Sequence, residues 1–308
     1  MDKPFIHQPV LLTECLHWLK PERGGLFIDG TLGGGGHAQA ILEASAKTSL
    51  WGFDQDIKAI EAAQKRLADY SGRFEAFCQN FRSIPAYLAM RNQKIDGLLL
   101  DLGVSSPQLD FDERGFSYMN DGPLDMRMNQ SAKLSAAQII AQSSEQELTA
   151  IFRQFGEEPK ARKIAGKICE QRLQQPFETT QELAELIFRM VPKAQAIKTK
   201  SRIFQALRIA VNDELTVLKN LLNNVLPFCN MNAVIAVISY HSLEDRIVKQ
   251  FFKRESQDCL CPPQKLICDC GHKSRLTILT RKIVTASPAE IAKNPRARSA
   301  KLRAAQIK

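Results

Sequence analysis

The stretch IDGTLGGGGH at residues 28–37 places five glycines, Gly30 and Gly33 to Gly36, between an apolar run and a helical pattern. Glycine is favoured where the backbone turns with a positive φ or where a ligand approaches the main chain closely. A strand, a glycine-rich turn and a helix in this order point the N–H groups of the helix start at a ligand. The stretch therefore predicts a ligand-binding turn within an α/β sheet.

Further strand-like runs follow at 50–56, 73–81 and 95–103, and the segment 57–70 has the apolar spacing of an amphipathic helix. Strands that alternate with helices are typical of βαβ units, whose strands run parallel. This first part of the chain therefore predicts a parallel sheet, with the glycine turn at the carboxyl end of its first strand.

The segments beyond about residue 130 have helical patterns instead. Capping-box signatures stand at Ser144–Glu147 and Thr179–Glu182, and one long helix is expected over 201–226. Helices with no strand pattern between them indicate an all-helical insertion.

Strand patterns return at 232–240, and 276–286 and 300–307 are predicted as the last two strands. The parallel sheet is thus expected to resume after the insertion. The predicted domains are a first sheet part at 1–110, the helical insertion at 111–204, and a second sheet part with a basic C-terminal segment at 205–308.

The chain of 308 residues carries 42 Lys and Arg against 33 Asp and Glu, a net charge of +9. This excess favours a polyanionic partner, and it is largest from Gly271 onward, where ten basic residues face one acid, Glu290. The first residues lack a basic segment followed by an apolar one, and the apolar runs are too short to span a membrane. We therefore expect a cytoplasmic protein without membrane contact.

The second strand ends with Asp54, 25 residues after Asp29. An acid there accepts hydrogen bonds from both ribose hydroxyls of an adenosine-type cofactor, and Asp56 is the competing candidate. A nicotinamide dinucleotide and S-adenosylmethionine both fit a glycine turn that is followed by such an acid. The turn begins with an acid and lacks a clean G-x-G-x-x-G run, which favours S-adenosylmethionine.

The fourth strand ends in DLGVSSPQLD at 101–110, which is expected to line the ligand crevice of the sheet. Methylation of an exocyclic base amine needs two acceptors for the amine hydrogens, so that the lone pair turns toward the methyl group. The turn Ser105, Ser106 and Pro107 offers hydroxyl and carbonyl oxygens for this task. An ordinary turn with local hydrogen bonds is the alternative.

Seven blocks of the sequence together resemble one known family. They are HQPVLLTE at 7–14, IDGTLGGGGH at 28–37, DLGVSSPQLD at 101–110, RGFSYMNDGPLDMRM at 114–128, FQALRIAVNDEL at 204–215, SYHSLEDRIVK at 239–249 and NPRARSAKLR at 294–303. The family is ribosomal RNA small subunit methyltransferase H, the S-adenosylmethionine-dependent cytosine N4-methyltransferases of 16S rRNA. The resemblance covers essentially the whole chain.

The resemblance implies a Rossmann-like class I methyltransferase sheet with an inserted helical substrate-recognition domain. The implied activity is methylation of the exocyclic N4 of a decoding-centre cytidine, and the implied partner is 16S rRNA in the small ribosomal subunit. Implied cofactor contacts lie in the glycine turn and after the strands, at Gly35, Gly36, His37, Asp54, Phe81, Asp101 and Gln108.

Other amino-methyltransferases end the fourth strand with Asp, Asn or Ser, then a Pro-Pro pair and an aromatic residue that stacks on the base, whereas Ser106 and Pro107 are followed by Gln108 here. Phe116 or Tyr118 is expected to stack instead, and a core role for both is the alternative. Asp125, paired with Arg127, is expected to orient the base, and a structural ion pair is the alternative. The candidate catalytic residues are therefore Ser105, Ser106, Pro107 and Asp125.

Four of the eight cysteines lie in CLCPPQKLICDC at 259–270, as two C-x-C pairs separated by six residues. Four thiolates brought together by a loop suit tetrahedral zinc. A structural zinc site is therefore predicted at Cys259, Cys261, Cys268 and Cys270. The usual zinc spacing is C-x-x-C, so reduced thiols in a basic loop are the alternative.

Three other functions stay open at this point. A nicotinamide-dependent oxidoreductase would use the same glycine turn, a catalytically silent ribosome assembly factor would use the same basic surface, and a related methyltransferase would act on DNA or on a protein amine. The sequence also leaves open whether the protein is a monomer or a homodimer, and whether it acts on naked RNA or on the assembled subunit.

Overall fold

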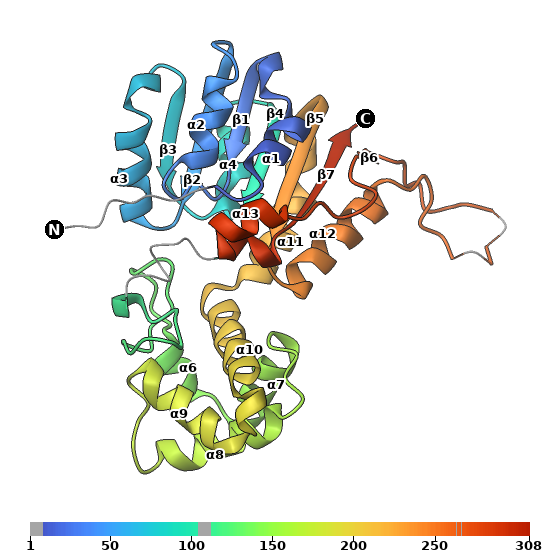
Figure 1. Ribbon diagram of the computed structural model, residues 1–308. Coiled ribbons are helices and arrows are strands. Elements are labelled where there is room, and N and C mark those ends of the chain that lie inside the picture. Colours follow the sequence, from blue (N-terminus) through green and yellow to red (C-terminus); the bar gives the residue numbers. More distant parts are fainter. Residues whose placement is uncertain (1–8, 104–111, 263, 266) are drawn as a thin grey trace. The chain divides into compact units, whose positions relative to one another are not determined.

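The computed structural model describes residues 9–103, 112–262, 264–265 and 267–308 (Figure 1). The chain forms two compact units, unit 1 from Met1–Gly103 and Leu215–Lys308, and unit 2 from Val104–Glu214. Unit 1 is therefore built from two segments that are separated in sequence by the whole of unit 2. The functional domains predicted at 1–110, 111–204 and 205–308 remain a prediction. The two units are defined by which residues pack together, and this says nothing of which part binds a cofactor or a substrate.

Unit 1 contains a seven-stranded sheet in the order β3-β2-β1-β4-β5-β7-β6. Strands β1 to β5 run parallel, as predicted. The expectation that the sheet stays parallel after the insertion is wrong for β7, which runs antiparallel to both β5 and β6. The fold is thus the predicted α/β class with a Rossmann-like sheet. The strands are β1 (Gly25–Asp29), β2 (Thr48–Asp54), β3 (Phe74–Cys78), β4 (Ile95–Asp101), β5 (Cys229–Ser239), β6 (Leu276–Ile278) and β7 (Lys301–Ile307).

The strand predicted at 276–286 is shorter than expected, because only Leu276–Ile278 pairs as β6. The side-chain oxygen of Thr280 accepts the N–H of Ala304 at 2.9 Å. This hydroxyl takes the place of a strand carbonyl, so the regular ladder ends there.

Helices cover both faces of the sheet. One core contains residues of α1 (Leu12–Leu19), α2 (Gly36–Glu43) and α3 (Ile57–Arg66), and the other contains residues of α4 (Ile84–Met90), α11 (Glu214–Val225) and α12 (Ser242–Glu255). Both faces are buried, which is why the central strands read as nearly continuous apolar runs. The remaining short elements of unit 1 are α13 (Pro288–Lys293) and 3-10 helices at Pro21–Arg23, Ala68–Tyr70, Phe81–Ser83, Leu226–Phe228 and Pro295–Ser299.

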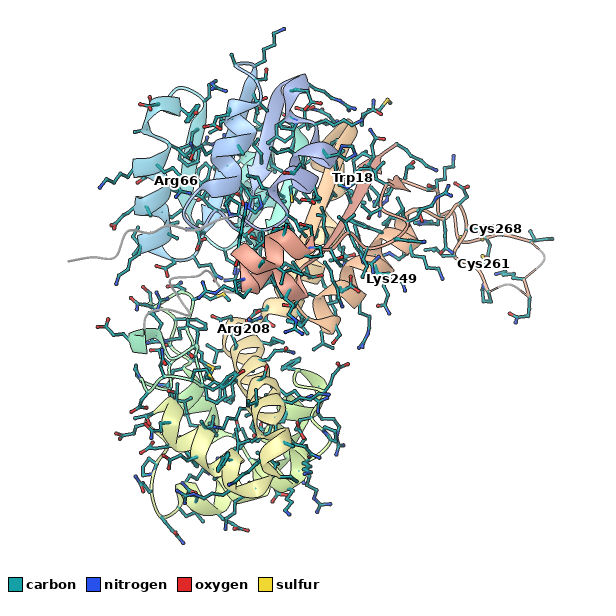
Figure 2. The ribbon with its side chains drawn as sticks, viewed as in Figure 1. Trp18, Arg66, Arg208, Lys249, Cys261 and Cys268 are labelled. Carbon is teal, nitrogen blue, oxygen red and sulfur yellow. The ribbon has the colours of Figure 1, made fainter. Side chains whose placement is uncertain are left out.

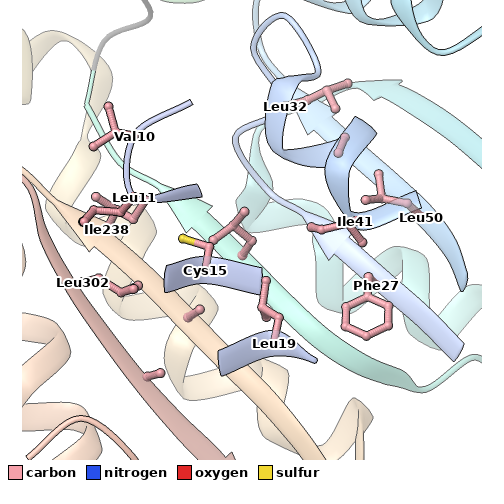
Figure 3. Packing of buried hydrophobic residues seen from close by; sticks show 14 of the residues in the cluster. Val10, Leu11, Cys15, Leu19, Phe27, Leu32, Ile41, Leu50, Ile238 and Leu302 are labelled. Carbon is pink, nitrogen blue, oxygen red and sulfur yellow. The ribbon is translucent and has the colours of Figure 1, made fainter. Parts of the chain in front are cut away.

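Phe27 of β1 shows how tightly the first core is packed (Figure 3). Gly97 of β4 is the Cα partner of Phe27 across the parallel pair, and a Cβ at Gly97 would lie 2.4 Å from the Phe27 ring. Real Cβ atoms do not approach a ring so closely, so this position of β4 requires glycine.

Unit 2 is helical, as predicted, with one isolated bridge between Pro123 and Thr179 in its described residues. Both predicted capping boxes are present, because Ser144 and Thr179 accept the N–H groups of Glu147 and Glu182 at 3.2 and 3.3 Å. Its helices are α6 (Ala136–Gln142), α7 (Glu145–Gln154), α8 (Ala161–Arg172), α9 (Thr180–Met190), α10 (Lys193–Asn212) and a 3-10 helix at Asp112–Arg114.

The single helix predicted over 201–226 is wrong. Asp213 has a φ of +50° and separates α10 from α11. Asp enters this left-handed region more readily than most residues, and the apolar periodicity of the two helices does not reveal the break. Over the described ranges, no helix combines the length and the apolar character that crossing a membrane requires.

Candidate functional site

The glycine turn joins β1 to α2, where the sequence predicted it. Gly33 and Gly35 have φ angles of +49° and +76°, in the region that favours glycine. A Cβ at Gly36 would lie 2.6 Å from the Pro9 ring, and a Cβ at Gly30 would lie 2.5 Å from the Leu100 side chain. The glycines are therefore required partly by backbone conformation and partly by close packing.

Asp54 at the end of β2 fixes the shape of this turn. Its Oδ2 accepts the N–H of Gly33 at 2.9 Å, and its Oδ1 accepts the N–H of Asp56 at 2.9 Å. Burial raises the pKa of Asp54 to about 6, although these N–H groups oppose the shift. Asp56 caps α3 by accepting the N–H of Lys58, so Asp54 is the acid that faces the turn.

Asp29 at the end of β1 is a buried acid with one unsatisfied oxygen. Its Oδ1 accepts the N–H of Thr31 at 3.1 Å, whereas its Oδ2 has no hydrogen-bond partner among the described residues. Burial raises the pKa of Asp29 to about 6, although the hydrogen bond from the Thr31 N–H opposes the shift. A buried acceptor without a donor costs about 1–3 kcal/mol, so this oxygen is suited to a donor on a bound ligand.

Asp101 at the end of β4 is held by two neighbours in unit 1. Its Oδ1 accepts the Tyr240 hydroxyl at 2.8 Å, and its N–H donates to Thr31 Oγ1 at 2.6 Å. Burial raises the pKa of Asp101 to about 7, with the Tyr240 hydrogen bond opposing the shift and the nearby charge of Glu244 adding to it. The side chain is 13% exposed, so solvent screens it little.

His37 in the first turn of α2 lies beside Asp101. Its Nε2 is 3.0 Å from the carbonyl oxygen of Val10, which only accepts, so Nε2 carries a proton. Its Nδ1 lies 3.9 Å from Asp101 Oδ2, and burial lowers the pKa of His37. The neutral ring therefore presents its Nδ1 lone pair toward the carboxyl group of Asp101.

Phe81 begins the 3-10 helix that follows β3 and packs against the second core. A Cβ at Gly30 would lie 3.3 Å from the Phe81 Cβ, so Phe81 stands next to the start of the glycine turn. The structure thus brings together six of the predicted cofactor-contact residues, namely Gly35, Gly36, His37, Asp54, Phe81 and Asp101.

Three acids therefore meet at one edge of the sheet, because β2, β1 and β4 are neighbours and their carboxyl ends coincide. Sequence reasoning did not predict Thr31 or Tyr240 as site residues, and it used Asp29 only as the acid that opens the turn. Each lies at the end of a strand or within two residues of it, which is the signal that points to them. Ser105, Ser106, Pro107 and Gln108 lie outside the described residues.

The candidate residues of unit 2 lie in a tightly bonded loop. Asp125 accepts from Arg127 through both carboxylate oxygens, at 2.8 and 2.6 Å, and Arg127 also donates to the carbonyl oxygen of Ala132. Burial raises the pKa of Asp125, but the Arg127 hydrogen bonds outweigh it and hold the pKa below its ordinary value. Phe116 and Tyr118 pack in the core of unit 2, which agrees with the core alternative.

The four cysteines predicted to bind zinc come together. Their Sγ atoms all lie within 4.8 Å of one another, in the segment between α12 and β6. Figure 2 labels Cys261 and Cys268 on this segment, which extends away from the sheet of unit 1.

An open α/β sheet with an antiparallel β7 beside β5, a glycine turn after β1 and acids after β1, β2 and β4 defines a Rossmann-like methyltransferase fold. The model of the MraW methylase family matches residues 4–308, and the chain belongs to this family.

Curated relatives match almost the whole chain. A protein of Halothermothrix orenii is 47% identical over 97% of this chain and 98% of its own length. A protein of Syntrophotalea carbinolica is 49% identical over 97% of each chain, and one of Heliobacterium modesticaldum is 47% identical over 98% of each chain. All three are named ribosomal RNA small subunit methyltransferase H.

Proposed function

We propose that this protein transfers a methyl group from S-adenosylmethionine to the exocyclic N4 of a decoding-centre cytidine in 16S rRNA of the small ribosomal subunit. The observation that carries the proposal is the set of Asp29, Asp54 and Asp101 around the glycine turn. The name shared by the full-length relatives supports the choice of small-subunit rRNA. The choice of the cytidine N4 rests on the sequence resemblance.

The residues of the site fit S-adenosylmethionine, which supplies an electrophilic methyl group when it is bound. The carboxylate of Asp54 has lone pairs beyond those used by Gly33 and Asp56, and these suit ribose hydroxyls. The unsatisfied Oδ2 of Asp29 suits a hydroxyl or ammonium donor. His37, Phe81 and Gln108 complete the proposed contacts with Gly35, Gly36 and Asp101.

The acidic residues of the site favour S-adenosylmethionine over a nicotinamide dinucleotide. Three buried acids with raised pKa values surround the turn, and each already resists ionisation. A pyrophosphate would add negative charge beside them, which is unfavourable in a poorly solvated site. The sulfonium and ammonium groups of S-adenosylmethionine are positive, and they stabilise ionised carboxylates instead.

In this proposal the acceptors for the target amine come from Ser105, Ser106 and Pro107, which follow β4, and Asp125 orients the base. Holding both amine hydrogens would localise the nitrogen lone pair so that it can attack the methyl carbon. As the N–C bond formed, the S–CH3 bond would break to leave S-adenosylhomocysteine, and the methylated amine would release one proton. Zinc has no role in this chemistry, and the four cysteines form a separate structural proposal. We place the enzyme in the cytoplasm, where small ribosomal subunits are assembled, as a monomer or a homodimer.

The test uses small subunits that lack the modification. Purified protein and labelled S-adenosylmethionine are incubated with these subunits or with naked 16S rRNA, and the methylated nucleoside is mapped by mass spectrometry. The expected product is a single N4-methylated cytidine. A methyl group on another nucleoside would refute the target, and binding without any transfer would favour the silent assembly factor.

Calorimetry with S-adenosylhomocysteine tests the site itself. Asp54→Ala removes the carboxylate that bonds Gly33 and is expected to weaken binding at least tenfold, since loss of charged hydrogen bonds costs about 1.5–3 kcal/mol each. The matched control is Asp69→Ala, an exposed acid of the same unit, which should bind normally. Binding of NAD, with no binding of S-adenosylhomocysteine, would identify an oxidoreductase.

A further inference from the structure

The segment 256–275 connects α12 to β6 and has no helix or strand in its described residues. Loops of this length inside a compact domain are uncommon, and they are usually functional or disordered. Two of its described apolar side chains, Leu260 and Ile267, are 42% and 79% exposed, so neither anchors the loop in a hydrophobic core. Some other interaction is needed if the outer part of the loop is to keep one conformation.

The two ends of this loop are clamped together independently of the cysteines. The carboxylate of Glu255, which is 1% exposed, pairs with Arg254 at 2.7 Å and with Arg275 at 2.6 Å. The N–H of Arg275 also donates to the carbonyl oxygen of Glu255 at 2.8 Å. These bonds fix the base of the loop, but they do not reach the residues from Cys259 to Cys270.

The four thiols occupy the outer part of the loop in a compact group, with their Sγ atoms within 4.8 Å of one another. The Sγ of Cys268 lies 3.3 Å from that of Cys259, 3.5 Å from that of Cys270 and 4.0 Å from that of Cys261, and the Cys259 and Cys270 sulfurs are 3.9 Å apart. Zinc–sulfur bonds of about 2.3 Å place the corners of a tetrahedron about 3.8 Å apart. We propose that these four cysteines bind one structural zinc ion, which orders the loop.

The backbone around the sulfurs suits thiolates. The N–H of Leu260 points to the Sγ of Cys270 at 3.4 Å, and the N–H of Cys261 points to the Sγ of Cys259 at 3.3 Å. Gly271 has a φ of +62°, which bends the chain directly after the last cysteine. Such N–H groups orient metal-bound sulfurs and share part of their negative charge.

Asp269 lies beside the group, with its Oδ1 3.6 Å from the Sγ of Cys261. Its other oxygen pairs with Lys265, so its charge is partly neutralised when Cys261 ionises. Disulfide bonds are a poorer explanation, because a bonded pair of sulfurs is about 2.0 Å apart and all four thiols are free. Four cysteine sulfurs are soft ligands, and together they fill all four positions of a tetrahedral ion. This favours zinc over magnesium or calcium.

The experiment measures the metal content of the full-length protein purified without chelators. We expect about one zinc ion per chain, and Cys261→Ser and Cys268→Ser should each lose most of it. The matched control is Cys169→Ser, which changes a thiol of unit 2 and should keep its zinc. Replacement of zinc by cobalt should give the visible absorption of tetrahedral thiolate coordination.

Limited trypsin digestion tests the ordering role. Lys265 is exposed between the two cysteine pairs, and its cleavage should accelerate at least tenfold after chelation, while cleavage at the exposed Lys133 of unit 2 stays the same. Folded wild-type protein that contains no zinc, whether its four thiols are free or joined in disulfides, would overturn the proposal. Iron in place of zinc, or equal cleavage at Lys265 with and without metal, would also overturn it.

Discussion

Replacing Asp101 with Asn is expected to stabilise unit 1 at about pH 8 and to change little near pH 4. The folded protein raises the pKa of Asp101 from an ordinary value of 3.8 to about 7, chiefly through burial. Between these two values the unfolded chain has released its proton while the folded chain still holds it. The free energy of unfolding therefore falls as the pH rises through this window.

The size of the effect follows from the shift. About three pKa units at about 1.4 kcal/mol each amount to roughly 4 kcal/mol of lost stability above pH 7. Asn keeps a carbonyl oxygen for the Tyr240 hydroxyl and cannot ionise. The variant should therefore recover most of this free energy at about pH 8, and lose binding of S-adenosylhomocysteine at the same time.

The assay is urea unfolding followed by tryptophan fluorescence, at several pH values and without ligand. Both tryptophans, Trp18 and Trp51, belong to unit 1, so the signal reports that unit. Asp69→Asn, which removes an exposed charge from the same unit, is the control and should follow the wild-type curve. If Asp101→Asn shows the same pH dependence as the wild type, the buried-acid reasoning is wrong.

Two further predictions concern the cores. Gly97→Ala would place a Cβ 2.4 Å from the Phe27 ring and should destabilise unit 1 by about 1–3 kcal/mol, seen as a lower urea midpoint of tryptophan fluorescence. Phe152→Ala empties a fully buried position of unit 2 and should cost about 3–5 kcal/mol, seen by circular dichroism, because unit 2 is helical. An unchanged midpoint in either case would contradict the packing described.

The sequence predicted the parts of the fold that depend on local pattern. The glycine turn, the first four strands and both capping boxes follow from residue type and spacing over a few positions, and the structure contains all of them. The antiparallel direction of β7 and the break at Asp213 were not predicted. Both depend on how distant segments pack, which periodicity does not report.

The candidate site was predictable to a similar extent. Asp54 and Asp101 stand at strand ends, and any parallel sheet brings strand ends together. The bond from Tyr240 to Asp101 joins residues 139 positions apart, and the unsatisfied oxygen of Asp29 is a matter of burial. Neither has a local sequence signal. The roles of Ser105, Ser106, Pro107, Gln108 and Asp125 remain predictions.

The neighbouring strands β4 and β5 are separated in sequence by about 130 residues, which include the whole of unit 2. At about 5–20 residues per second, the ribosome needs roughly 6–25 s to make this stretch. During that time the edge of β4 that later pairs with β5, at the apolar residues Leu98, Leu99 and Leu100, has no partner strand. The nascent chain therefore passes through an aggregation-prone stage, in which the helical unit can fold first and chaperones have an exposed edge to shield.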